Sequence, residues 1–258
     1  MAQVETLLAP FLNLMIKGES ENDKSSFFDL DGTLISNTTG EIPKSARKSI
    51  DFLRMNGVRV FTATGRHMSE IKDLPAFDIQ FDGFITLNGQ LCLDSRKELL
   101  YGEPISERNV EQMLTMFEAR KVPLMLVEKD RMYINYIDEM VEKAQAAINT
   151  AVPDIGTYSG EPIYQFILYS EEKTAEKIVA GLEDCKMTRW NPYGVDIISK
   201  SGGGKWPESS GSYRLAGFDV MKSWHLEMVK MIWTCSAMQE SGSRWEMQRK
   251  MSKCVRII

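Results

Sequence analysis

Two acidic residues, Asp29 and Asp31, stand one residue apart at the end of an apolar run, and Gly32 follows them directly. Side chains at positions i and i+2 of a strand share one face, so a strand that ends here leaves both carboxylates at its carboxyl edge. Open α/β sheets bind ligands at this edge. Such a pair suits phosphoryl transfer through an aspartyl-phosphate, with one carboxylate as nucleophile and the other as proton donor. An acidic turn that binds a structural cation is the alternative.

The sequence behind this pair predicts further strands that end in polar residues. An amphipathic helix and a strand at 58–63 complete a βαβ unit, and this strand ends at Thr64 and Gly65. A hydroxyl and free backbone N–H groups at such a junction can hold a phosphate. The next apolar strand, at 81–87, ends at Asn88. We therefore expect an α/β protein with a Rossmann-like, doubly wound parallel-sheet core.

The pattern changes between residues 86 and 188, where hairpins and amphipathic helices alternate. This stretch predicts an α+β cap domain inserted into a core made of residues 24–85 and 189–258. Strand character returns at 195–198, and a glycine run then leads to Lys205. Like charges at contact distance repel by several kcal/mol, so a lysine here could supply the cation that lets a carboxylate approach a phosphate dianion.

Composition narrows the class of protein. The 258 residues are 43% hydrophobic, which is ordinary for a water-soluble globular protein of one or two domains. A formal net charge of −5 gives no sign of the positively charged surface that nucleic-acid binding requires. The four cysteines lack metal-ligand spacing and suit a reducing cytoplasm. The apolar stretch at 7–16 is too short to span a bilayer, so we expect no membrane partner. Oligomeric state stays open.

Four stretches together resemble the haloacid dehalogenase-like hydrolases of the Cof type, class IIB. They are Asp29–Leu34, Thr64–Arg66, Leu87–Gly89 and Gly203–Lys205, and the resemblance runs from Phe27 to about Lys205. It implies a phosphoric monoester hydrolase that acts on sugar phosphates and other small phosphorylated metabolites. It also implies a Mg²⁺ cofactor and an inserted cap that selects the leaving group.

The resemblance assigns roles to particular residues. Asp29 would be the nucleophile and a Mg²⁺ ligand, and Asp31 would be the general acid and base, binding the metal through its carbonyl. Thr64 and Lys205 would hold the phosphoryl oxygens. Three further residues would lie at the phosphate or substrate: Gly32, Gly65 and Asn88.

The chain departs from the family after Lys205. The family's fourth motif, Gly-Asp-Gly-x-Asn-Asp, is missing, and the run 221–233 stands in its place. Because methionine and tryptophan each have one codon, the coding DNA can be partly reconstructed and read one base earlier. In that frame it admits Glu-Ile-Met-Ala-Leu-Gly-Asp-Gly-Glu-Asn-Asp, so we interpret the tail from about Met221 as the product of a frameshift. A divergent but genuine terminus is the alternative.

Two other segments fit the same interpretation less tightly. Residues 207–213 can be reread as an apolar-faced helix, so the core could be aberrant from about 207. Residues 1–23 could be a translated leader that precedes the native start. With the fourth motif missing, two other functions stay open: a catalytically silent phosphate-binding protein, or a phosphotransferase or mutase on the same scaffold.

Overall fold

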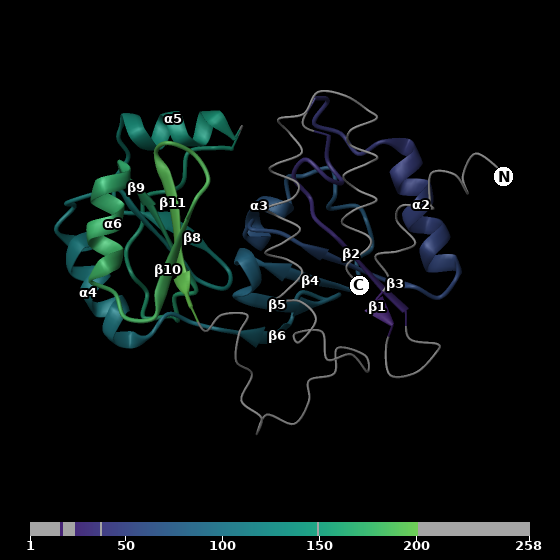
Figure 1. Ribbon diagram of the computed structural model, residues 1–258, viewed down its shortest axis with the longest axis horizontal. Coiled ribbons are helices and arrows are strands. Elements are labelled where there is room, and N and C mark those ends of the chain that lie inside the picture. Colours follow the sequence, from purple (N-terminus) through teal and green to yellow (C-terminus); the bar gives the residue numbers. More distant parts are fainter. Residues whose placement is uncertain (1–15, 18–23, 37, 149, 201–258) are drawn as a thin grey trace, which may run out of the picture.

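The computed structural model describes residues 16–17, 24–36, 38–148 and 150–200, with side chains from Ser26 onward. The chain forms two lobes, one built on each of two sheets (Figure 1). Lys205, the tail that we interpret as frameshifted and nearly all of the expected leader lie outside the described residues.

The first lobe is a mixed sheet of six strands, in the order β1-β2-β3-β4-β5-β6. Strands β2, β3 and β4 run parallel, and the other pairs are antiparallel. The strand bounds are β1 Ile16–Lys17, β2 Lys24–Phe28, β3 Arg59–Ala63, β4 Gly83–Thr86, β5 Leu91–Asp94 and β6 Leu99–Gly102. The helices are α2 Lys44–Met55, α3 Met68–Ile71 and the 3₁₀ turn Leu87–Gly89.

Helix α2 connects β2 to β3 and makes the βαβ unit that the sequence predicted. Its Ile50 and Leu53 are each 2% exposed and pack into the apolar cluster of this lobe. The helix ends where Gly57 adopts a φ of +73°, a backbone conformation that glycine adopts without strain. The prediction of a Rossmann-like α/β core is confirmed.

The second lobe is an antiparallel sheet of five strands, in the order β10-β11-β9-β7-β8. The strand bounds are β7 Leu124–Val127, β8 Met132–Ile134, β9 Gln165–Tyr169, β10 Cys185–Arg189 and β11 Gly194–Ser199. The helices are α4 Glu107–Glu118, α5 Glu139–Ala147 and α6 Glu172–Ala180. We call this lobe the cap.

Alternate residues of the cap strands point to opposite faces of the sheet. Val195 and Ile197 of β11 join a cluster with residues of α4 and α6. The other face carries Met125 and Val127 of β7, which cluster with Leu87 and Leu91 of the first lobe. These apolar residues therefore pack the cap against the end of β4 and the start of β5.

The two sheets divide the chain differently from the expected domains. Residues 91–102, expected in the cap, form β5 and β6 and extend the first sheet beside β4. Residues 194–199, expected in the second part of the core, form β11 in the middle of the cap sheet. Alternation of apolar residues predicts a strand, but the partner strand depends on tertiary packing.

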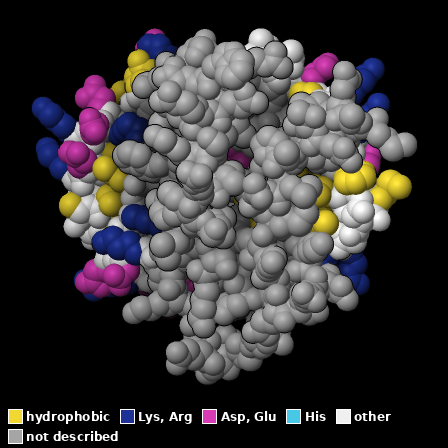
Figure 2. All heavy atoms as spheres, turned by 45° about the vertical axis from the view of Figure 1, so that its right-hand side comes forward, with side chains coloured by type: hydrophobic (Ala, Val, Ile, Leu, Met, Phe, Trp, Pro, Cys, Tyr) yellow, Lys and Arg dark blue, Asp and Glu magenta, His cyan; other side chains and the backbone are white. Residues whose placement is uncertain are grey.

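The described surface carries charges of both signs. On the face in Figure 2, lysine and arginine side chains lie interspersed with aspartate and glutamate along the left margin. Among the described residues, no helix combines the length and the apolar character that crossing a bilayer requires.

Candidate active site

The turn after β2 carries the first two predicted catalytic residues. The Gly32 N–H donates to the Ile35 carbonyl at 3.0 Å, and the Ile35 N–H donates to the Leu30 carbonyl at 2.8 Å. Gly32 has a φ of +72°, which a residue with a Cβ rarely adopts. The Thr33 hydroxyl donates to Asp29 Oδ2 at 2.9 Å. The turn thus fixes the Asp29 carboxylate at the carboxyl end of β2.

Asp29 is a carboxylate whose charge is not compensated by a nearby basic group among the described residues. Burial raises its pKa to about 6, and the negative charge of Asp31 adds to this effect. The hydrogen bond from Thr33 opposes the shift. A carboxylate in this setting favours a partner that brings positive charge.

Asp31 is instead paired with Arg66. The Arg66 Nε donates to Asp31 Oδ2 and Nη2 donates to Oδ1, each at 2.8 Å. The Asp31 side chain is 48% exposed, whereas that of Arg66 is 18% exposed. Such bidentate contacts restrict the position and orientation of a carboxylate. Arg66 stood in the motif that we used to recognise the site, but we assigned it no role.

The ends of β3 and β4 place the predicted phosphate-binding residues together. Thr64 is buried, and its hydroxyl accepts from the Arg66 N–H at 3.2 Å. The Asn88 N–H donates to the Thr64 carbonyl at 3.3 Å. A Cβ added to Gly65 would lie 3.0 Å from Asn88 Oδ1, so the two loops touch. Since Arg66 reaches Asp31, both loops lie beside the aspartate turn.

Asn88 also contacts the cap. Its Nδ2 donates to Asp196 Oδ2 on β11 at 3.2 Å, across 108 residues of sequence. Burial raises the pKa of Asp196 to about 7, hydrogen bonds from Asn88 and Trp190 oppose this shift, and the charge of Glu70 reinforces it. We did not identify Asp196 from sequence. The sequence feature that could have identified it is an acidic residue inside an otherwise apolar strand.

His67 forms a second polar contact between the lobes. It caps α3 by accepting from the Ser69 N–H at Nδ1, and its Nε2 lies 3.0 Å from the Lys129 carbonyl of the cap. Burial lowers the pKa of His67. The neutral tautomer with a proton on Nε2 satisfies both contacts, because Nδ1 then accepts and Nε2 donates.

The donor set fits a hard divalent cation. Asp29 and Asp31 offer only oxygen ligands, which Mg²⁺ prefers. Burial raises the pKa of Asp29 because it disfavours the negative charge of the carboxylate, and a bound cation would compensate that charge. Within the described residues, no group of three histidine, cysteine or acidic side chains could hold a metal. A complete Mg²⁺ site would therefore draw on backbone oxygens, water, substrate or residues outside the described part of the chain as well.

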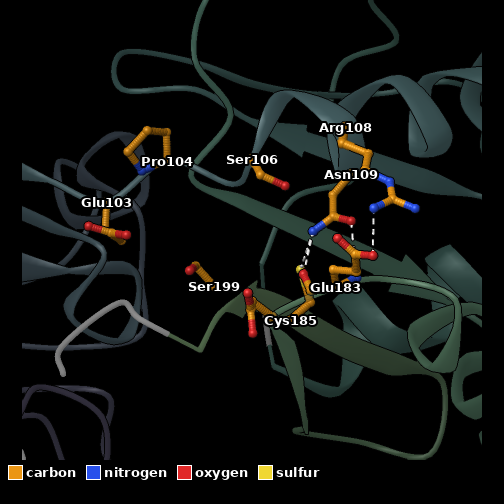
Figure 3. Close-up of a pocket in the computed structure, with 9 residues that line it drawn as sticks. Glu103, Pro104, Ser106, Arg108, Asn109, Glu183, Cys185 and Ser199 are labelled. Carbon is orange, nitrogen blue, oxygen red and sulfur yellow. Dashed lines mark hydrogen bonds and ion pairs between the residues drawn. The ribbon is translucent and has the colours of Figure 1, made fainter. Parts of the chain in front are cut away.

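A separate pocket of about 290 Å³ lies where the connection from β6 to α4 passes the start of β10 and the end of β11 (Figure 3). Asn109 donates to the Glu183 carbonyl at 2.6 Å beside it, and Arg108 pairs with the Glu183 carboxylate. None of the predicted catalytic or phosphate-binding residues that the structure describes lines this pocket. We therefore place the candidate site at the strand ends.

Comparisons with known proteins identify the family. A family model described as haloacid dehalogenase-like hydrolase matches residues 26–203. The provisionally named phosphatase YkrA of Bacillus subtilis (strain 168) is 27% identical over 184 residues, which are 70% of each chain.

Solved structures share the fold. The subclass IIB sugar phosphatase BT4131 has a TM-score of 0.59 and 27% identity, over 69% of this chain and 70% of that one. BT1666 from Bacteroides thetaiotaomicron, a phosphatase of the haloalkanoate superfamily, has a TM-score of 0.61 and 21% identity, over 72% and 70%. These comparisons confirm two predictions: the family, and the enzyme class of phosphoric monoester hydrolase.

Proposed function

Because the chain belongs to the haloacid dehalogenase-like hydrolase family, we propose that it is a Mg²⁺-dependent phosphatase of small phosphorylated metabolites, with Asp29 as the nucleophile. The observation that carries this proposal is the meeting of the Asp29 and Asp31 turn with the Thr64, Gly65 and Asn88 loops at one edge of the sheet. Sugar phosphates are the substrates that we favour, because a structural relative at 27% identity is a sugar phosphatase.

In this mechanism an oxygen of Asp29 attacks phosphorus while the bond from phosphorus to the leaving oxygen breaks. Asp31 gives its proton to that oxygen and later accepts one from the water that hydrolyses the aspartyl-phosphate. For either proton transfer, Asp31 must break at least one of its two hydrogen bonds with Arg66, because Arg66 donates to both carboxylate oxygens. Thr64 and Asn88 would orient the phosphoryl group.

Asp29 and Asp31 are the described residues that would hold Mg²⁺, which would offset their charge and that of the phosphate. Lys205 belongs to the proposal as a phosphate ligand from outside the described residues. We also propose a cytoplasmic location and a small phosphorylated metabolite as the partner.

The test is phosphate release from glucose 6-phosphate by the full chain, with and without Mg²⁺. Asp29→Asn should abolish release, because an amide is a poor nucleophile, whereas Asp78→Asn, which alters an exposed ion pair with Arg47, should leave it unchanged. Equal activity of the Asp29→Asn variant and the unmodified chain would refute the nucleophile assignment. Binding without release would favour the silent phosphate-binding protein, and transfer to an acceptor sugar would favour a phosphotransferase or mutase.

The frameshift remains a proposal about the gene. Resequencing the coding DNA for residues 205–258 tests it directly. Recovery of the missing Gly-Asp-Gly-x-Asn-Asp motif by a single base change would support it, and an unchanged reading frame would contradict it.

A further inference from the structure

The core-facing side of the cap sheet carries one acidic side chain among its strands. Asp196 pairs in register with Ile167 of β9, and Ile167 packs in the apolar cluster that joins the two lobes. Its neighbours Val195 and Ile197 point the other way, toward α4 and α6. The fold therefore presents the Asp196 carboxylate to the core, where it meets Asn88.

Nothing basic among the described residues pairs with this carboxylate. Its hydrogen-bond partners are the neutral side chains of Asn88 and Trp190, and the nearby Glu70 adds negative charge. Lys186 shares the same face of the edge strand β10, but the described part of the chain shows no ion pair between the two. Because the pKa of Asp196 is raised to about 7, its carboxyl group is mostly ionised above that pH, and its negative charge then acts on whatever lies beside Asn88.

Asn88 connects this charge to the candidate phosphate site. Its backbone N–H binds the Thr64 carbonyl, and its side chain binds Asp196. A phosphate ester held by the Thr64 loop would have its leaving group next to the cap. Gln165 lies on the same face of β9, two residues before Ile167, and its Oε1 is buried without a hydrogen-bond partner among the described residues.

These groups have a clear chemical preference. A carboxylate and an amide oxygen both accept hydrogen bonds from hydroxyl groups. A second anionic group in the same place would face Asp196 directly, and like charges brought together at an interface are strongly disfavoured. Discrimination by repulsion is a common source of specificity.

We propose that Asp196 is a specificity-determining residue that the cap holds beside Asn88, so that the site accepts phosphate esters of neutral hydroxylated alcohols and rejects those with a second negative charge. The proposal rests on the phosphatase function, and it concerns the part of the substrate that does not react.

The test uses substrate pairs that differ only in that charge. Sorbitol 6-phosphate and 6-phosphogluconate have the same carbon chain, as do glycerol 3-phosphate and 3-phosphoglycerate. The kcat/KM of each is measured above about pH 8, where Asp196 is ionised, with the full chain and with Asp196→Asn, which keeps an oxygen that can accept from Asn88. Asp196→Glu keeps the charge, and Asp154→Asn removes an exposed charge elsewhere in the cap.

We expect the unmodified chain to prefer the neutral member of each pair. Asp196→Asn should shift the ratio by about tenfold or more toward the acidic member, whereas Asp196→Glu and Asp154→Asn should keep the original preference. A ratio that does not change in Asp196→Asn, or an equal loss on both members, would overturn the specificity role.

Failure of the phosphatase function has a different signature, because no ester would then be hydrolysed by any of the proteins. In that case calorimetric binding of the same four esters, in the presence of Mg²⁺, replaces kcat/KM. The same shift in the ratio of Kd values would support the role of Asp196, and unchanged ratios or no binding would overturn it.

Discussion

Replacing Asp29, the nucleophile that we propose, should stabilise the folded protein. The pKa of Asp29 is raised from 3.8 to about 6, mainly by burial and then by Asp31. A raised carboxyl pKa means that the folded state binds the proton more tightly than the unfolded state, so ionisation destabilises the fold as the pH rises through about 6. Asp29→Asn removes this charge and keeps an oxygen that can accept from the Thr33 hydroxyl.

The size of the effect follows from the shift. Each pKa unit corresponds to about 1.4 kcal/mol, so a shift of about two units sets an upper limit of roughly 3 kcal/mol. Asp29 is not fully buried, and water therefore screens part of the penalty. We expect Asp29→Asn to raise the free energy of unfolding by about 1–2 kcal/mol at neutral pH in the absence of Mg²⁺.

Urea unfolding followed by circular dichroism, at several values between about pH 4 and pH 8, measures this difference. The advantage of Asp29→Asn should shrink toward the acidic end of this range, because Asp29 is then protonated in the folded state and increasingly protonated in the unfolded state. Asp31→Asn is the matched control, because it loses the contact with Arg66 and should gain no stability. Mg²⁺ should narrow the gap by binding the unmodified chain more tightly. An Asp29→Asn variant that gains nothing near pH 8, or gains equally at every pH, would refute the burial argument.

Three further substitutions test the site. Arg66→Lys cannot hold both oxygens of Asp31, so steady-state kinetics should show kcat reduced by roughly tenfold with little change in KM; an unchanged kcat would exclude this positioning role. Gly65→Ala places a Cβ 3.0 Å from Asn88 Oδ1, so phosphate-ester affinity measured by calorimetry should fall, and unaltered affinity would contradict the contact. His67→Asn keeps an acceptor for α3 but loses the cap carbonyl, so urea unfolding should show a loss of about 1 kcal/mol. Equal stability of the His67→Asn variant would show that this contact does not hold the lobes together.

Local sequence accounts for much of the first lobe. The burial of β3 and β4 and the helix between β2 and β3 follow from apolar runs and the helical spacing of Ile50 and Leu53. Because parallel strands end at a common edge, the same pattern places Thr64 and Asn88 near the aspartate turn. The β7–β8 hairpin and the amphipathic helix α5 likewise fit the alternation of hairpins and helices that the sequence predicted for this stretch.

Tertiary structure decided which strand pairs with which. Residues 91–102 and 194–199 have strand-like patterns that fit either sheet equally well, since alternation fixes a face and leaves the partner open. Packing placed β5 and β6 in the first sheet and β11 in the cap.

The sequence by itself determined the pair of carboxylates at the end of β2, because two acidic residues at i and i+2 followed by a glycine turn are a local arrangement. It could not reveal the contacts of Asp31 with Arg66, of Asn88 with Asp196, or of His67 with the cap. These pairs join residues 35 to 108 positions apart, and only the packing of the two lobes brings them within hydrogen-bonding distance.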